Sequence, residues 1–119
     1  MKVIRSGDTP ENVASAPIFV GDVHSRNLID RTSSETLSVT LVRFTDGARN
    51  KRHTHTADQI LYVTEGHGII ANDSGEEHVH GGDIAHIPAG EIHWHGAAPG
   101  ENMVHLSILP PSTTKVIDD

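Results

Sequence analysis

The chain has 119 residues, a net charge of −7 and no cysteine, so its length fits one domain and neither disulfides nor thiolate metal sites are possible. Its basic residues are few and scattered, which argues against nucleic acid or an anionic membrane as a partner. There is no long apolar run and no signal peptide, so we expect a cytoplasmic protein. Ten histidines are the outlier of the composition.

The first part of the chain combines irregular and strand-like segments. Residues 1–16 are rich in small polar residues and are predicted to form an irregular N-terminal arm. Apolar and polar residues alternate cleanly over Leu37–Phe44, which predicts a half-buried strand. Asp46-Gly47 and Glu65-Gly66 combine residue types that favour turns, so each is predicted to end a strand.

The same pattern of short apolar runs and turn residues continues over residues 17–110. About nine or ten short strands, with no helical period longer than one turn, predict an all-β sandwich or barrel. Pro110-Pro111 is expected to end the regular structure, which leaves residues 111–119 as a C-terminal tail.

A candidate metal site begins with His53 and His55, which are separated by one residue. Alternate residues of a strand point to the same face, so two imidazoles about 7 Å apart can chelate one ion. Residues 56–58 predict a turn, and if the chain doubles back there, Gln59 faces the two histidines across a hairpin. A fourth ligand must come from elsewhere, and the other dense histidine stretch contains His93 and His95.

Two spaced motifs surround these residues. The first is G-x5-HxH-x3-Q-x6-G from Gly47 to Gly66, and the second is G-x5-PxG-x2-H-x3-A from Gly82 to Ala97. They resemble the two motifs of the cupin family, at the family's spacing, over about residues 36–110. The resemblance implies an all-β cupin (jelly-roll) β-barrel in a single domain. It also implies this set of metal ligands: His53, His55, Gln59 and His93.

The sequence departs from the common cupin pattern at two positions, where Gln59 replaces the usual Glu and Ala97 the usual Asn. The stretch PAGEIHWHGA is similar to that of small manganese cupins with hydroxynitrile lyase activity, which also use a Gln ligand. Mn²⁺ is therefore the expected cofactor, although Fe²⁺, Ni²⁺, Zn²⁺ and Co²⁺ suit the same ligands. A neutral Gln leaves the ion's +2 charge uncompensated, which favours Lewis-acid or proton-transfer chemistry over metal-centred oxidation.

Two further histidines are candidate catalytic residues. His95 follows His93 by two residues and shares its face, so it is a candidate general acid or base; a hydrogen-bonded histidine at the barrel mouth is the alternative. On its strand, His105 points away from the apolar face, so its side chain could point into the cavity. The alternative is a core histidine whose hydrogen bonds are satisfied within the protein. Three residues are expected in the substrate pocket, the last on the resemblance alone: Thr40, Val42 and Asn50.

A second HxH motif, His78-Val79-His80, is excluded as a source of ligands for this site. Glu76-Glu77 precedes it and Gly81-Gly82 follows it, which indicates a solvated hairpin end. Trp94 alternates away from its histidine neighbours, so we expect it outside the barrel or at a dimer interface.

The resemblance implies a metal-dependent lyase that acts on small hydroxylated or carbonyl substrates, with cleavage and synthesis of cyanohydrins as the concrete case. An Fe-dependent dioxygenase and a non-catalytic domain that binds small molecules are the alternatives. Small cupins of this kind usually pair through N-terminal strands, so a homodimer through residues 17–24 is expected.

Overall fold

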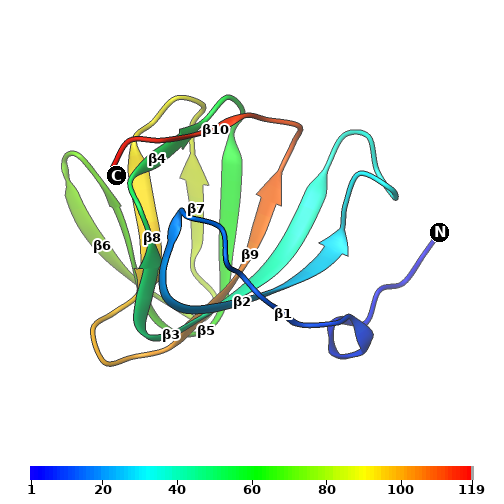
Figure 1. The fold of residues 1–119 in the computed structure, drawn as a ribbon, viewed down its shortest axis with the longest axis horizontal. Helices are drawn as coiled ribbons and strands as arrows, with labels where there is room; N and C mark the ends of the chain where they lie inside the picture. The colour runs from blue at the N-terminus through cyan, green and yellow to red at the C-terminus, as the bar shows by residue number, and fades with distance from the viewer. Residues whose placement is uncertain (119) are drawn as a thin grey trace.

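The computed structural model describes residues 1–118, and these form a rolled antiparallel sheet (Figure 1). The prediction of an all-β barrel is confirmed, since the described residues contain one short 3₁₀ turn, η1 (Ser6–Asp8), as their sole helical element. None of these residues forms a helix long and apolar enough to cross a membrane. The last residue of the expected tail, 119, lies outside the described residues.

The strands are β1 (Asn12–Val13), β2 (Phe19–Ile29), β3 (Ser38–Asn50), β4 (His53–His55), β5 (Gln59–Asn72), β6 (Gly75–His80), β7 (Ile84–Ile87), β8 (His93–Ala97), β9 (Met103–Leu109) and β10 (Thr114–Val116).

The strand order is β1-β2-β3-β9-β5-β8-β4-β10, and β6 and β7 also pair with β5. The long strand β5 therefore contacts four others and holds the barrel together. The turn predicted at Glu65-Gly66 is wrong, because β5 continues through it with a shift of register. Gly66 has φ 86°, and a Cβ there would lie 2.1 Å from the Asn102 carbonyl oxygen. This glycine therefore allows a bend and a close backbone approach without reversing the chain.

The turn predicted at Asp46-Gly47 is also wrong, because β3 runs through both residues. Both have positive φ, 51° and 74°, a conformation that turn residues tolerate. Their backbone N–H groups bond to the loop before β9, the first to the Asn102 side chain and the second to the Glu101 carbonyl. These contacts between distant segments bend the strand at a point where local sequence favours a hairpin.

The interior of the barrel has two chemically different parts. One is an apolar core whose most buried members include Phe44, Val63, Val23 and Met103. The other is polar and holds six buried side chains: Asn50, His53, Gln59, His93, His95 and His105. Buried polar groups need partners to offset the cost of leaving water, so this second part is a candidate site.

The C-terminal segment adds a strand that the sequence did not predict. Pro110-Pro111 ends β9, but the chain then crosses the barrel mouth and forms β10 against β4. Thr114 lies opposite His55 and Val116 lies opposite His53. The expectation that regular structure ends at Pro110 is therefore wrong, because β4 offers an edge with which the returning chain pairs.

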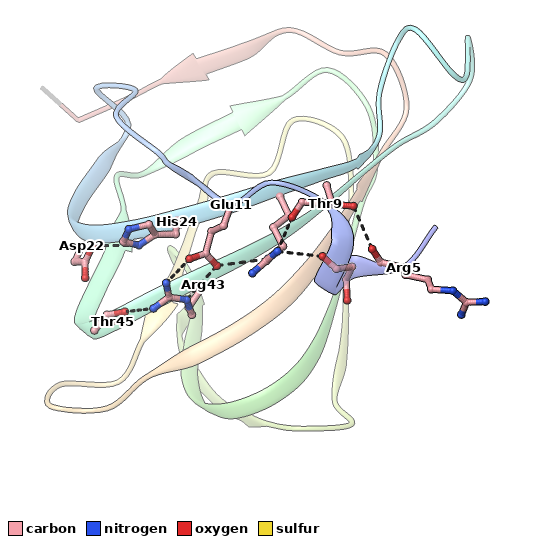
Figure 2. Close-up of polar contacts among 9 residues, drawn as sticks. Arg5, Thr9, Glu11, Asp22, His24, Arg43 and Thr45 are labelled. Atoms are coloured by element: carbon pink, nitrogen blue, oxygen red, sulfur yellow. Dashed lines mark hydrogen bonds and ion pairs between the residues drawn. The ribbon is translucent and has the colours of Figure 1, made fainter. Parts of the chain in front are cut away.

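The N-terminal arm is attached to the outside of β2 and β3 (Figure 2). Glu11 accepts hydrogen bonds from the Arg43 guanidinium, which lowers the pKa of the Glu11 carboxyl, and it also pairs with Arg26. Arg26 in turn donates to the carbonyl groups of Ser6 and Thr9. These contacts position the segment that enters β2. A homodimer through residues 17–24 stays a prediction, because the structure describes one chain.

Candidate metal centre

Three strands bring the expected ligands together. His53 and His55 lie on β4, His93 lies opposite His53 on β8, and Gln59 is the first residue of β5. One nitrogen from each of the three histidines lies within 4.8 Å of the others, so the group could hold a metal ion. The expected hairpin is wrong, since β4 pairs with β8 and β10 and not with β5. The Gln59 side chain nevertheless reaches the site from its own strand.

The outer nitrogen of each imidazole has a partner that orients the ring. His53 Nδ1 donates to the Lys51 carbonyl at 2.6 Å, and His93 Nδ1 donates to the Glu91 carbonyl at 2.9 Å. A carbonyl only accepts, so these protons lie on Nδ1 and each Nε2 keeps its lone pair. His55 Nδ1 lies 2.9 Å from the Thr114 hydroxyl. Its Nε2 is buried and has no hydrogen-bond partner among the described residues, as expected of an atom that ligates an ion.

Gln59 contributes an oxygen to the same space. Its Nε2 donates to Ser107 Oγ at 2.9 Å, which turns Oε1 toward His93 Nε2, 3.2 Å away. Both of these atoms are acceptors when His93 carries its proton on Nδ1, and two acceptors this close repel each other. A cation bound to both would replace that repulsion with attraction. The residues present therefore fit a divalent transition metal held by three imidazoles and one amide oxygen.

The ligands are neutral at pH 7. Burial, together with repulsion from His93, lowers the pKa of His53 and of His55 to about 4, and burial also lowers that of His93. The neutral imidazole is the form that binds a metal. None of the described residues that line the adjoining cavity is acidic, so the charge of a bound ion would stay uncompensated.

The cavity beside these ligands has a volume of about 530 Å³. All three expected pocket residues, Thr40, Val42 and Asn50, line it, as do His95 and His105. Sequence reasoning missed several other lining residues, among them two that touch ligands, Ser107 and Thr114, and three large apolar ones: Phe19, Leu109 and Val116. Strand alternation from His105 identifies Ser107 and Leu109, which lie on the same face of β9. The other three lie at the start of β2 or on β10, where local sequence carries no such signal.

The two candidate catalytic histidines form a buried chain with Asn50. Asn50 Oδ1 accepts from the His95 backbone N–H at 2.9 Å, so Asn50 Nδ2, at 3.1 Å, donates to His95 Nε2. His95 Nδ1 then carries the proton and donates to His105 Nε2 at 3.0 Å. His105 Nδ1 is buried and has no hydrogen-bond partner in the described chain. His105 is thus a core histidine that is only half satisfied, and Asn50 determines the tautomer of both rings.

Burial also keeps these two imidazoles neutral. It lowers the pKa of His95 well below the ordinary value, with repulsion from His105 as the next cause, and it lowers that of His105 to about 4. Neutral imidazoles beside an ion site can accept protons from a bound molecule.

Trp94 lies on the outside of the barrel, as expected. It packs against the small cluster of Ile69, Ala71 and Ala98, and the Arg49 guanidinium lies 4.8 Å from its ring centre. Arg49 therefore takes part in a cation–π contact with Trp94. His78 and His80 also lie outside the barrel on exposed strand positions, and neither belongs to the group of three histidines.

Three comparisons with known proteins agree with this geometry. The family model for the cupin domain matches residues 40–109. The (R)-mandelonitrile lyase of Granulicella tundricola is 35% identical over 119 residues, which cover 99% of this chain and 91% of that protein. A cupin-like protein from Thermotoga maritima superposes with a TM-score of 0.79 at 31% identity, covering 98% of this chain and 90% of that one.

The polyketide cyclase RemF from Streptomyces resistomycificus superposes with a TM-score of 0.89 at 23% identity and covers 100% of this chain and 87% of that one. This likeness concerns the fold alone. Together with the matched family and the two relatives above 30% identity, it confirms the fold that the two sequence motifs predicted. The chain belongs to the cupin family.

Proposed function

We propose that the protein is a metal-dependent lyase that cleaves and forms cyanohydrins of small aldehydes or ketones. The observation that carries the proposal is the neutral set of ligands, which opens into a cavity that also contains two neutral buried histidines. Such a site suits proton transfer to and from a small hydroxylated molecule. The 35% identical relative, which is named a mandelonitrile lyase, supports the same chemistry.

His53, His55, Gln59 and His93 would hold the metal, for which Mn²⁺ is our expectation. When bound, this ion would supply a Lewis acid that lowers the pKa of a substrate hydroxyl and stabilises negative charge. The amide ligand adds no negative charge of its own, so the full +2 charge would be available to the substrate.

His95 is the proposed proton carrier. In cleavage, its Nε2 would take the hydroxyl proton, the carbon–carbon bond to the nitrile would break, and the electron pair would leave with cyanide. Cyanide would then take the proton from His95 and leave as HCN. Nε2 contacts the Asn50 amide in this structure, so the substrate hydroxyl has to replace that contact. His105 would keep accepting from His95 Nδ1 and so stabilise the imidazolium.

The apolar part of the cavity would bind the remainder of the substrate. Phe19, Leu109 and Val116 come from three different strands or strand ends and line the cavity together. Their burial against an aromatic or aliphatic substituent would exclude water from the reacting atoms. We therefore propose small apolar cyanohydrins as the substrate class.

The test is to load the protein with Mn²⁺ or Fe²⁺ and to measure release of benzaldehyde and cyanide from mandelonitrile. We expect activity that the metal-free protein and His53→Ala lack. Oxygen consumption is recorded in parallel, because an oxygen-consuming reaction with no release of cyanide would indicate a dioxygenase. If the metal-loaded protein carries out neither reaction, the proposal is overturned and a binding protein becomes the better account.

A further inference from the structure

Three histidines on the outside of the barrel take no part in the centre described above. The antiparallel register places His67 of β5 directly opposite His80 of β6. His78 precedes His80 by two residues, so its side chain lies on the same face of the sheet. Sequence reasoning recognised the HxH pair but missed His67, because only strand pairing brings this residue beside it.

The His67 ring contacts each of the other two rings. His67 Nε2 lies 2.8 Å from His78 Nδ1, and the His80 ring stacks on the His67 ring with 4.5 Å between centres and 8° between planes. His67 is half-buried and the other two are exposed. Two imidazole nitrogens therefore meet at a place that an ion can reach from solvent, while the third ring supports the orientation of the first.

We propose that His67 and His78 form a second, exchangeable metal site that binds Cu²⁺ or Ni²⁺, with His80 as a positioning residue. A nitrogen–nitrogen contact of 2.8 Å holds a single proton. When this proton moves to the other nitrogen of the donor ring, both contacting nitrogens present lone pairs that a metal ion would bind. With metal–nitrogen bonds of about 2.0–2.1 Å, this separation corresponds to an angle of about 85° at the metal. That angle is near the one between neighbouring ligands in square-planar and octahedral centres, and far from the tetrahedral one.

The surroundings favour a cation of this kind. The chain carries a net charge of −7, which attracts cations to its surface. In the turn between β6 and β7, an Asp83 carboxylate oxygen accepts from the His80 backbone N–H at 2.7 Å. Imidazole affinity rises from Mn²⁺ to Cu²⁺ along the first transition series, so two exposed imidazoles should bind Ni²⁺ or Cu²⁺ and leave Mn²⁺ in solution. The two sites would therefore differ in the metals that they retain.

Equilibrium dialysis of the full chain against Ni²⁺, and separately against Mn²⁺, tests the proposal. We expect the parent to bind about two Ni²⁺ ions but about one Mn²⁺ ion per chain, because only the inner site has four ligands. His78→Ala and His67→Ala should each bind about one Ni²⁺. The matched control is His86→Ala, which removes an exposed histidine paired with Asp58 and should still bind about two. A parent that binds one Ni²⁺, or variants that bind as many as the parent, would overturn the proposal.

A second measurement separates the two sites. His53→Ala, which damages the inner site, should still bind about one Ni²⁺, and the double variant with His78→Ala should bind almost none. His80→Ala should keep the second ion but bind it more weakly, since only the stacking partner of His67 is lost. Lyase activity of the Mn²⁺-loaded His78→Ala protein should equal that of the parent, so loss of the outer site and failure of the proposed function remain distinguishable.

Discussion

Two HxH motifs, His53-Thr54-His55 and His78-Val79-His80, lie on strands of one barrel and have different surroundings. The first lies inside, where His53 is 1% exposed, whereas both histidines of the second are exposed. Strand β4 pairs with β8, which places His93 beside the first motif. Strand β6 pairs with β5, which places His67 beside the second motif. Spacing along the chain orients two imidazoles equally well in both places, so the neighbouring strand decides what the motif can bind.

The second difference lies in what holds the far side of each ring. Inside the barrel, carbonyl groups and the Thr114 hydroxyl occupy the outer nitrogens and leave the inner ones free. Outside, His67 and His78 bond directly to each other. Ligands with fixed tautomers are arranged for an ion in advance, whereas a mutual hydrogen bond has to be broken first. We therefore expect tight binding inside and exchangeable binding outside.

The prediction with the largest expected effect compares one substitution in each motif. His53→Ala should lose most of the approximately one Mn²⁺ ion per chain and have a lower melting temperature, because metal binding adds to folding stability. His80→Ala, the matched substitution in the exposed motif, should keep both the metal and the melting temperature. Elemental analysis and thermal unfolding measure the two quantities. Equal Mn²⁺ content in both variants would contradict the assigned ligands.

His95 tests whether the inner cluster does more than bind metal. His95→Ala should leave Mn²⁺ content unchanged, because the four proposed ligands are other residues. Its activity on mandelonitrile should fall by about 10²–10⁴-fold, the usual contribution of a positioned acid or base. Steady-state kinetics together with metal analysis provide the measurement, with His78→Ala as the control. Full activity in His95→Ala would move the proton-transfer role to His105.

Acid stability tests the burial of His105, whose pKa burial lowers from 6.5 to about 4. As the pH falls, the imidazole of His105 takes up a proton at a higher pH in the unfolded chain than in the folded protein. The contribution of the neutral imidazole is therefore fully present above pH 6.5 and is lost between pH 6.5 and about 4. The shift corresponds to about 3 kcal/mol of unfolding free energy. Urea unfolding of metal-free protein at several pH values should show a shallower acid dependence for His105→Gln than for the parent.

The control for this measurement is Val63→Ala, which lies opposite His105 on β5, is fully buried and has no titrating group. It should lower stability by the same amount at every pH, so its acid dependence should match that of the parent. If His105→Gln also matched the parent, His105 would not be the buried neutral group that the structure indicates.

The smallest expected effect concerns Gln59, the inner ligand that neither HxH motif contains. Gln59→Glu should tighten Mn²⁺ binding and lower the M³⁺/M²⁺ potential, because a carboxylate adds negative charge beside the ion. Competition with a chelator and redox titration of the Fe-loaded protein measure these changes. Glu76→Gln changes the charge beside the exposed motif and should alter neither quantity. An unchanged potential in Gln59→Glu would show that the ligand's charge does not control the metal.

Much of the inner site was predictable because its signals are local. Strand alternation places His53 with His55, and the spacing of two motifs adds Gln59 and His93 through resemblance to a family. The all-β barrel follows from short apolar runs punctuated by turn residues. The same local reasoning placed turns at Asp46-Gly47 and Glu65-Gly66, where the structure has bent continuous strands, because turn chemistry alone does not distinguish a bulge from a hairpin.

The sequence by itself therefore determined the fold class, since period-2 patterning acts over a few residues, and the resemblance of its two spaced motifs to a family supplied the proposed ligands. Tertiary structure alone decided which strands meet. It brought Thr114 to His55 through the unpredicted strand β10 and Ser107 to Gln59. It also brought His67 to His78 on the outer face. The physical reason is that strand pairing joins residues far apart in the chain, and the register that decides which side chains touch is set by the whole barrel.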